Sequence, residues 1–349
     1  MTWRIPIARP DLPPLEEYMI SVADIWRSRQ LSNFGPFVEC LEKIASDHLG
    51  VPCVAVASGD IGLICAVAAL RLPPLSKVLV PSFTFQSTIN AIVWNGHVPV
   101  FCDIHEDSLL MDIGTARWPA AAAVVTETFG VRYNTFKLPA SLPVVVDAAH
   151  AYGSSRPKDG APRVYSLSGT KVVTSAEGGI VASNDAEFLE RVRLMRGYGF
   201  SGDYDARAVG INGKMSELHA ALGCLTLPRV EAAVSRRNEI AMRYVVGLGL
   251  SVNPDMQWTS GGSAYKDFVV LFETGAEREM AERALTEAGI QTKRYFRPLH
   301  EQEAYKRFWT HHLPVTENVY WRSLCLPIFG SMTDAQVDEV CAVIIGAVR

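Results

Sequence analysis

Short apolar segments alternate with helical segments through the first two thirds of the chain, and this alternation constrains the fold more than any other feature. Apolar segments of strand length lie at residues 53–58, 77–82, 98–104, 121–127, 142–149, 163–168 and 178–184. Helical patterns lie at residues 36–50, closed by Gly50, at 59–72 and 85–96, and at 185–195, capped by Asn184 or Asp185. This order favours an α/β fold with a mostly parallel, seven-stranded sheet between helices. Ligands of such sheets bind at the carboxyl ends of the strands.

The pattern changes near residue 250, after a helical stretch at 215–250. The later segments favour a strand at 265–272, a helix at 276–289, a strand at 290–296 and a terminal helix at 333–348. We therefore predict an N-terminal arm and a large domain over residues 1–250, and a small α+β domain over residues 251–349. The proline-rich arm is expected to pack onto the small domain or onto a partner subunit.

Composition and charge exclude several classes of protein. The formal net charge is −4, with 48% hydrophobic and 20% charged residues, which is typical of a soluble globular protein and argues against nucleic acid as a partner. No apolar run is long enough to span a bilayer, and the start of the chain does not resemble a secretion signal, so we expect a cytoplasmic protein. The seven cysteines form no C-x-x-C pair, which favours reduced thiols such as Cys53, Cys65 and Cys102 in apolar surroundings over a metal site or disulfides.

Two polar side chains are expected to meet at the carboxyl edge of the sheet. Asp147 directly follows an apolar strand, and Lys171 comes 24 positions later, after one further strand. Pyridoxal phosphate requires both groups, a lysine for its Schiff base and a carboxylate that keeps its pyridine nitrogen protonated. Taken alone, Asp147 is equally well explained as a cap or turn residue, and His150 as a structural histidine.

Other residues fit the same cofactor. The strand, glycine turn and helix start at residues 56–66 offer backbone N–H groups to a phosphate, although an ordinary connection has the same pattern. Ser166 offers a hydroxyl and Phe85 a ring for stacking, although an isolated aromatic residue more often belongs to a core. A nicotinamide-binding loop is disfavoured, because the glycines of "GYGFSG" at 197–202 follow a helix and not a strand.

Several motifs together resemble the DegT/StrS family, the pyridoxal-phosphate-dependent nucleotide-sugar aminotransferases of fold type I. They are "DAAHAYG", "SLSGTK", "EGGIVASND", "RGYGFSG", "VGINGKMSELHAALG" and "TKRYFRPLHEQEAY", and the resemblance covers nearly the whole chain. It implies that Lys171 forms the Schiff base and later moves the substrate proton. It also implies cofactor-binding roles for Asp147, His150, Ser166, Phe85, Gly59 and Asp60. Asn212 would reach the phosphate of a neighbouring subunit in a homodimer, and Lys214 and His300 would lie near the nucleotide sugar.

The chain departs from the family pattern in two places. Asp60 stands where the family has threonine, so the carboxylate is expected to turn away, to cap the following helix, or to weaken cofactor binding. The segment 126–150 is shorter than in the family, whose members carry a longer helix between these two strands. Other residues must then cover the sheet there.

The resemblance implies transfer of an amino group from L-glutamate to a nucleotide-linked keto-sugar, and the motifs favour C4 of a dTDP-4-keto-6-deoxyhexose. The alternatives are amination at C3 of a 3-keto sugar, a keto-cyclitol substrate, and a non-catalytic protein that binds pyridoxal phosphate. Lys171 argues against a sugar dehydratase, because relatives of that kind have histidine at this position.

Overall fold

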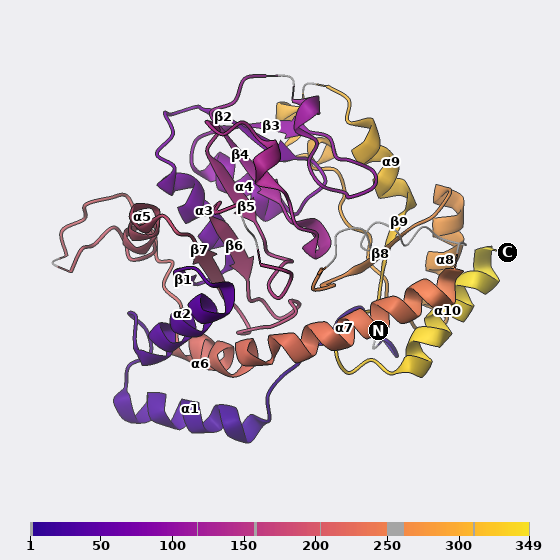
Figure 1. The fold of residues 1–349 in the computed structure, drawn as a ribbon, viewed down its shortest axis with the longest axis horizontal. Helices are drawn as coiled ribbons and strands as arrows, with labels where there is room; N and C mark the ends of the chain where they lie inside the picture. Colours follow the sequence, from indigo (N-terminus) through magenta and orange to yellow (C-terminus); the bar gives the residue numbers. More distant parts are fainter. Residues whose placement is uncertain are drawn as a thin grey trace.

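The computed structural model describes residues 3–116, 118–156, 159–202, 204–249, 262–309 and 311–348. Figure 1 shows a larger part built around a β-sheet and a smaller part near the C-terminus, with one long helix, α7, running from the first to the second. No helix in these ranges is long and apolar enough to cross a membrane.

The central sheet has seven strands in the order β1-β7-β6-β5-β4-β2-β3 (Figure 1). The strands are β1 (Cys53–Val56), β2 (Lys77–Pro81), β3 (Val98–Cys102), β4 (Ala122–Thr126), β5 (Val144–Asp147), β6 (Arg163–Ser166) and β7 (Gly179–Ala182). Strand β7 is antiparallel to both of its neighbours, and every other pair is parallel. The predicted mostly parallel sheet is confirmed, and each strand lies within its predicted segment.

Helices cover both faces of this sheet. Helices α2 (Pro36–Leu49) and α6 (Glu217–Thr226) belong to one core, and α3 (Gly59–Ala69), α4 (Gln86–Trp94) and α5 (Ala186–Arg196) belong to the other. Successive side chains of a strand point to opposite faces, so Val125 packs in the core with α2 and Val124 in the core with α3. Gly50 ends α2 with a φ of 74°, and the side chain of Asp185 caps α5 by accepting from the N–H of Phe188.

The connection between β4 and β5 contains only the 3-10 turns η2 (Thr128–Gly130) and η3 (Thr135–Lys137). Its side chains Val131, Tyr133 and Leu138 are buried in the same core as α2 and α6. The role of the missing helix therefore passes to the loop itself, which covers the sheet with its own apolar side chains.

The C-terminal part is an α+β unit with its own core. It contains α8 (Gly275–Glu287), α9 (Pro314–Arg322) and α10 (Asp334–Val348), with β8 (Phe268–Leu271) antiparallel to β9 (Ser323–Leu326). The second half of α7 (Val230–Leu248) packs into this core through Tyr244 and Leu248. The predicted domain boundary at residues 250 and 251 lies outside the described residues. Short 3-10 turns are η1 (Ile113–Thr115), η4 (Leu227–Arg229), η6 (Leu299–Glu301) and η7 (Lys306–Phe308).

Two expectations for the C-terminal part need correction. The strand predicted at 290–296 is wrong, because this segment forms only isolated bridges, from Ile290 to Ile5 and from Lys293 to Cys325. Strand β9 pairs with β8 instead. The apolar pattern predicted neither β9 nor α9.

The N-terminal arm packs onto the small part of its own chain, which was one of the two expected arrangements. Ile5 is fully buried in the core of that part. The arm continues into helix α1 (Leu15–Ser28), which was not predicted, and the hydroxyl of Tyr18 donates to the carbonyl of Leu218 on α6 at 3.1 Å. The apolar side chains of α1 remain exposed at Leu15, Met19, Ile20 and Trp26.

The covering role of the loop between β4 and β5 predicts the effect of a core substitution. Leu138→Ala should lower the free energy of unfolding by about 2–5 kcal/mol, because the lost side chain leaves a cavity. Phe136→Ala is the matched control, since this neighbouring side chain is 73% exposed and should change stability by less than about 0.5 kcal/mol. Urea denaturation followed by circular dichroism measures both, and equal effects would contradict the covering role.

Candidate active site

A cavity of about 300 Å³ opens at the carboxyl edge of the sheet. Strands β1, β2, β4, β5 and β6 end at this edge because they share one direction, and β7 begins there. The residues that follow these strands line the cavity together with a segment of the C-terminal part. They are Ser58, Gly59, Asp60, Leu63, Thr84, Phe85, Ser87, Thr126, Glu127, Thr128, Asp147, Ala149, His150, Ser166, Ser168, Thr170, Lys171, Glu177, Lys293, Tyr295 and Phe296.

Asp147 is the last residue of β5, and its carboxylate is held in place by two donors. The hydroxyl of Thr88 donates to Oδ2 at 2.7 Å, and the N–H of Ala149 donates to Oδ1 at 3.1 Å. Burial raises the pKa of Asp147, while these hydrogen bonds and the charge of Lys171 oppose that rise. A buried carboxylate of this kind is stabilised by a cationic or N–H partner on its cavity side.

Lys171 lies in the turn after β6, where its N–H donates to the carbonyl of Ser168 at 3.0 Å. Burial lowers the pKa of its amine to about 7, and the nearby ammonium of Lys266 acts in the same direction. The carboxylates of Asp267 and Asp147 oppose the shift. At neutral pH a large fraction of Lys171 is therefore uncharged, which is the nucleophilic form of an amine.

His150 packs among aromatic rings, with Phe129 and Phe296 at centroid distances of 6.2 and 6.1 Å. Its Nδ1 lies 3.7 Å from Oδ2 of Asp267 and has no hydrogen-bond partner among the described residues. Burial, followed by the charge of Lys171, lowers its pKa well below the usual range, so the contact with Asp267 is not an ion pair at neutral pH. The ring is therefore a neutral group at the cavity wall.

The start of α3 and the end of β6 approach each other closely at one end of the cavity. A Cβ atom at Gly59 would lie 3.0 Å from Cβ of Ser166, so a larger residue here would require Ser166 to shift by a few tenths of an ångström. Ser58 caps α3, because its hydroxyl accepts from the N–H of Ile61 at 3.1 Å. The expectation that Asp60 caps the helix is thus wrong, and Asp60 instead lines the cavity in the first turn.

Phe85 stands at the start of α4 and is 52% exposed, so it is not the core residue that an isolated aromatic suggests. Its ring belongs to the cavity wall. The structure thus brings together Lys171 and the six residues expected to bind a cofactor from within this chain.

The other three expected residues do not line this cavity. Lys214 donates to Oδ1 of Asn212 at 2.7 Å and lies over the ring of Tyr198 at 4.1 Å. The ring of His300 is fully buried, with Nδ1 at 2.7 Å from the hydroxyl of Ser82 and Nε2 at 3.2 Å from Glu317. In this geometry His300 has no free ring nitrogen for a substrate and joins the segment after β2 to α9.

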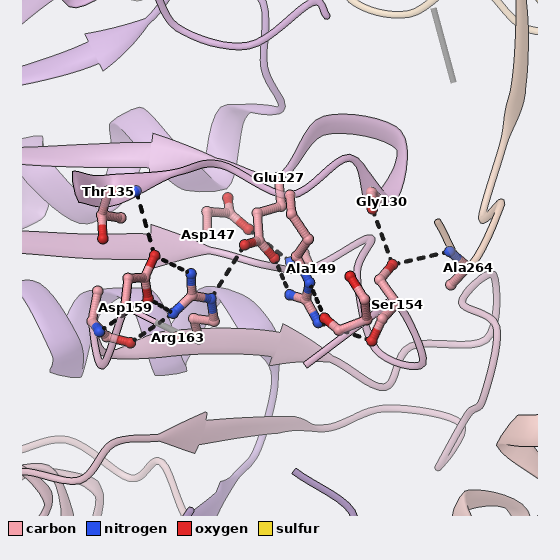
Figure 2. A network of polar contacts seen from close by, with 12 residues as sticks. Glu127, Gly130, Thr135, Asp147, Ala149, Ser154, Asp159, Arg163 and Ala264 are labelled. Atoms are coloured by element: carbon pink, nitrogen blue, oxygen red, sulfur yellow. Dashed lines mark hydrogen bonds and ion pairs between the residues drawn. The ribbon is translucent and has the colours of Figure 1, made fainter. Parts of the chain in front are cut away.

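A buried ionic network supports the strand ends, and the sequence interpretation missed it (Figure 2). Glu127 at the cavity accepts from Arg132 and, at 3.2 Å, from Arg163. Arg163 also donates to both carboxylate oxygens of Asp159, at 2.6 and 2.9 Å. Burial alone would raise the pKa of Asp159, but Arg163 brings it down to about 2. The sequence contained a signal for Glu127, because this carboxylate lies at the end of an apolar strand, as Asp147 does.

This fold, which places a low-pKa lysine and a buried carboxylate at the strand ends, is that of solved aminotransferases. The chain belongs to the DegT/DnrJ/EryC1/StrS aminotransferase family, whose model it matches over residues 15–345. It is therefore a sugar aminotransferase, and its family implies pyridoxal phosphate as cofactor.

Known relatives match almost the entire chain. It is 31% identical to the dTDP-4-amino-4,6-dideoxy-D-glucose transaminase of Escherichia coli, with 98% of each chain covered. It is 27% identical to the GDP-perosamine synthase of Escherichia coli O157:H7, with 97% of this chain and 96% of that protein covered. The crystal structure of DesI in the presence of its TDP-sugar product is 28% identical, with a TM-score of 0.90 over 100% of this chain and 94% of that one.

The pKa of Lys171 predicts unusual reactivity in the chain freed of cofactor. An amine-acylating reagent should modify Lys171 half-maximally near pH 7, because deprotonation exposes the reactive form. Exposed Lys43 is the control, since its hydrogen bond to Asp47 raises its pKa and its labelling should rise only at far higher pH. Mass spectrometry of the labelled peptides measures both, and parallel pH curves would contradict the assignment.

Proposed function

We propose that this chain transfers the amino group of L-glutamate to C4 of a dTDP-linked 4-keto-6-deoxyhexose with pyridoxal phosphate as cofactor. The observation that carries the proposal is the low-pKa amine of Lys171 in one cavity with the buried carboxylate of Asp147. The choice of sugar is supported by the relatives, since one is named for a dTDP-4-amino sugar and another was crystallised with its TDP-sugar product.

The cavity residues fit pyridoxal phosphate. Asp147 would pair with the ring nitrogen, which supplies the cationic N–H that a buried carboxylate requires. The first N–H groups of α3 have no partner within the helix and, with Ser166, would hold the phosphate. Phe85 would stack on the ring, and His150, whose Nδ1 has no hydrogen-bond partner among the described residues, would lie near a ring substituent. Asp60 in this cradle would weaken phosphate binding by charge repulsion and not abolish it.

The chain's own residues perform the proton transfers. Bound pyridoxal phosphate supplies an electron-withdrawing ring that stabilises negative charge on the carbon next to the transferred nitrogen. Lys171 accepts the proton from the donor carbon at Nζ and returns a proton to the acceptor carbon, which requires an amine that is uncharged near neutral pH. The donors Thr88 and Ala149 favour the ionised form of Asp147, which would hold the ring nitrogen of the cofactor protonated.

Spectroscopy and isotope transfer test the reaction. The chain mixed with pyridoxal phosphate should show a visible absorption band that glutamate bleaches, and Lys171→Ala should lose the lysine-dependent band. Asp147→Asn should lower kcat by about 100-fold or more, because a neutral amide no longer stabilises the charge on the ring. Labelled nitrogen from glutamate should appear in the dTDP-4-keto sugar.

Each failure has its own meaning. Label that enters only a 3-keto sugar would replace the proposal by 3-amination, and label that enters only a GDP-linked sugar would change the nucleotide. A visible band without any glutamate-dependent bleaching would indicate a non-catalytic cofactor-binding protein and overturn the enzymatic reaction.

The proposal includes a homodimer with shared active sites. The apolar side chains of α1, among them Leu15, Ile20 and Trp26, are exposed on an isolated subunit and suit a subunit interface. Asn212 lies outside the cavity of its own chain, which is consistent with a role in the site of a neighbour.

Complementation between inactive variants tests the shared site. Mixed dimers of Lys171→Ala and Asn212→Ala chains should regain activity, because one of their two sites then carries both substitutions and the other carries none. Random mixing should restore about a quarter of the wild-type activity. Lys171→Ala mixed with Asp147→Asn is the matched control, since these residues share one chain's cavity and no intact site forms. Recovery in neither mixture would contradict the shared site.

A further inference from the structure

A buried pair of opposite charges lies next to the active-site cavity without lining it. Lys266 and Asp267 immediately precede β8, and their side chains are only 3% and 5% exposed. The ammonium of Lys266 lies 2.8 Å from Oδ1 of Asp267. This pair belongs to the C-terminal part of the chain, whereas Lys171 belongs to the large part.

Both members of the pair contact side chains of the cavity wall. The ammonium of Lys266 lies 5.4 Å from the centroid of the Tyr295 ring, and the ammonium of Lys293 lies 4.6 Å from the same centroid. Oδ2 of Asp267 lies 3.7 Å from Nδ1 of His150. The pair therefore contacts two cavity residues, His150 and Tyr295.

Stability alone does not explain such a pair. Removing two charges from water costs several kcal/mol per ion, and well-packed apolar residues often replace a buried pair at no cost. Since Lys266 and Asp267 flank the catalytic cavity, their electric field is the property that apolar residues would not supply.

His150 and Tyr295, which the pair contacts, line the same cavity as Lys171, so the field of the pair reaches its amine. The charged and titratable groups around its amine are Lys266, Lys293, Asp267, Asp147 and the neutral ring of His150. Among the charged neighbours, Lys266 has the largest effect on the pKa of Lys171, and it lowers that pKa. Asp267 acts in the opposite direction.

We propose that Lys266 is a positioning residue whose buried ammonium, held by Asp267, keeps the amine of Lys171 uncharged. A residue of the C-terminal part of the chain then adjusts the catalytic base of the large part. This inference rests on the proposed role of Lys171. It requires that the charge at position 266 be retained, whereas a purely structural role requires only that the space be filled.

Lys266→Met separates the two roles. In the full chain freed of cofactor, the pH of half-maximal acylation of Lys171 should rise, and its labelling at pH 7 should slow by about fivefold for the first unit of that rise. Lys266→Arg, which retains the charge, should keep the wild-type value. In the cofactor-loaded chain, the pH at which the visible band changes should rise with Lys266→Met as well.

The double variant Lys266→Met/Asp267→Asn removes both charges of the pair. Its half-labelling pH should lie between those of the wild type and the single variant, because Asp267 no longer stabilises the charged amine. Lys43→Met, which removes a distant surface charge, should leave Lys171 unchanged.

Folded variants whose Lys171 labelling curve matches the wild type would overturn the inference, and the double variant provides this test if Lys266→Met does not fold. The labelling needs neither cofactor nor sugar. A chain that fails to aminate any sugar would therefore refute the proposed function without changing the labelling result.

Discussion

The site depends on keeping the amine of Lys171 and the carboxylate of Asp147 close together and shielded from water. Burial disfavours both charges, so it lowers the pKa of the lysine and raises that of the aspartate. As a result, the lysine can act as a base near neutral pH, and the aspartate requires a cationic partner. The surrounding hydrogen bonds and charges stabilise this otherwise costly arrangement.

The sheet provides the rigid support for these groups. Parallel strands bring their carboxyl ends to one edge, and the network of Glu127, Arg163 and Asp159 joins β4 and β6 across β5, the strand that carries Asp147 (Figure 2). The short loop after β4 covers the sheet with Tyr133 and Leu138 in place of a helix. A loop that buries its own apolar side chains therefore covers the sheet beside the site.

Much of the large part was predictable from the sequence, because buried strands and their helices leave strong local patterns. All seven strands and the glycine, aspartate and lysine at their ends follow from those patterns and from the family resemblance. The C-terminal part was harder to predict. The apolar residues at 290–296 resemble a strand, but they pair only through isolated bridges, and β9 occupies the place beside β8. Propensity does not determine which of two apolar segments pairs with a given strand.

The sequence by itself determined the succession of strands and helices in the central sheet and the residue types at the strand ends, since periodicity and composition act locally. Only the tertiary structure decided which charges share one low-dielectric space. Lys266 and Asp267 are distant from Lys171 in the chain, and no local pattern marks them, yet they lie beside the same cavity. Electrostatic effects depend on distance and burial in three dimensions, so the reactivity of Lys171 is a property of the folded chain.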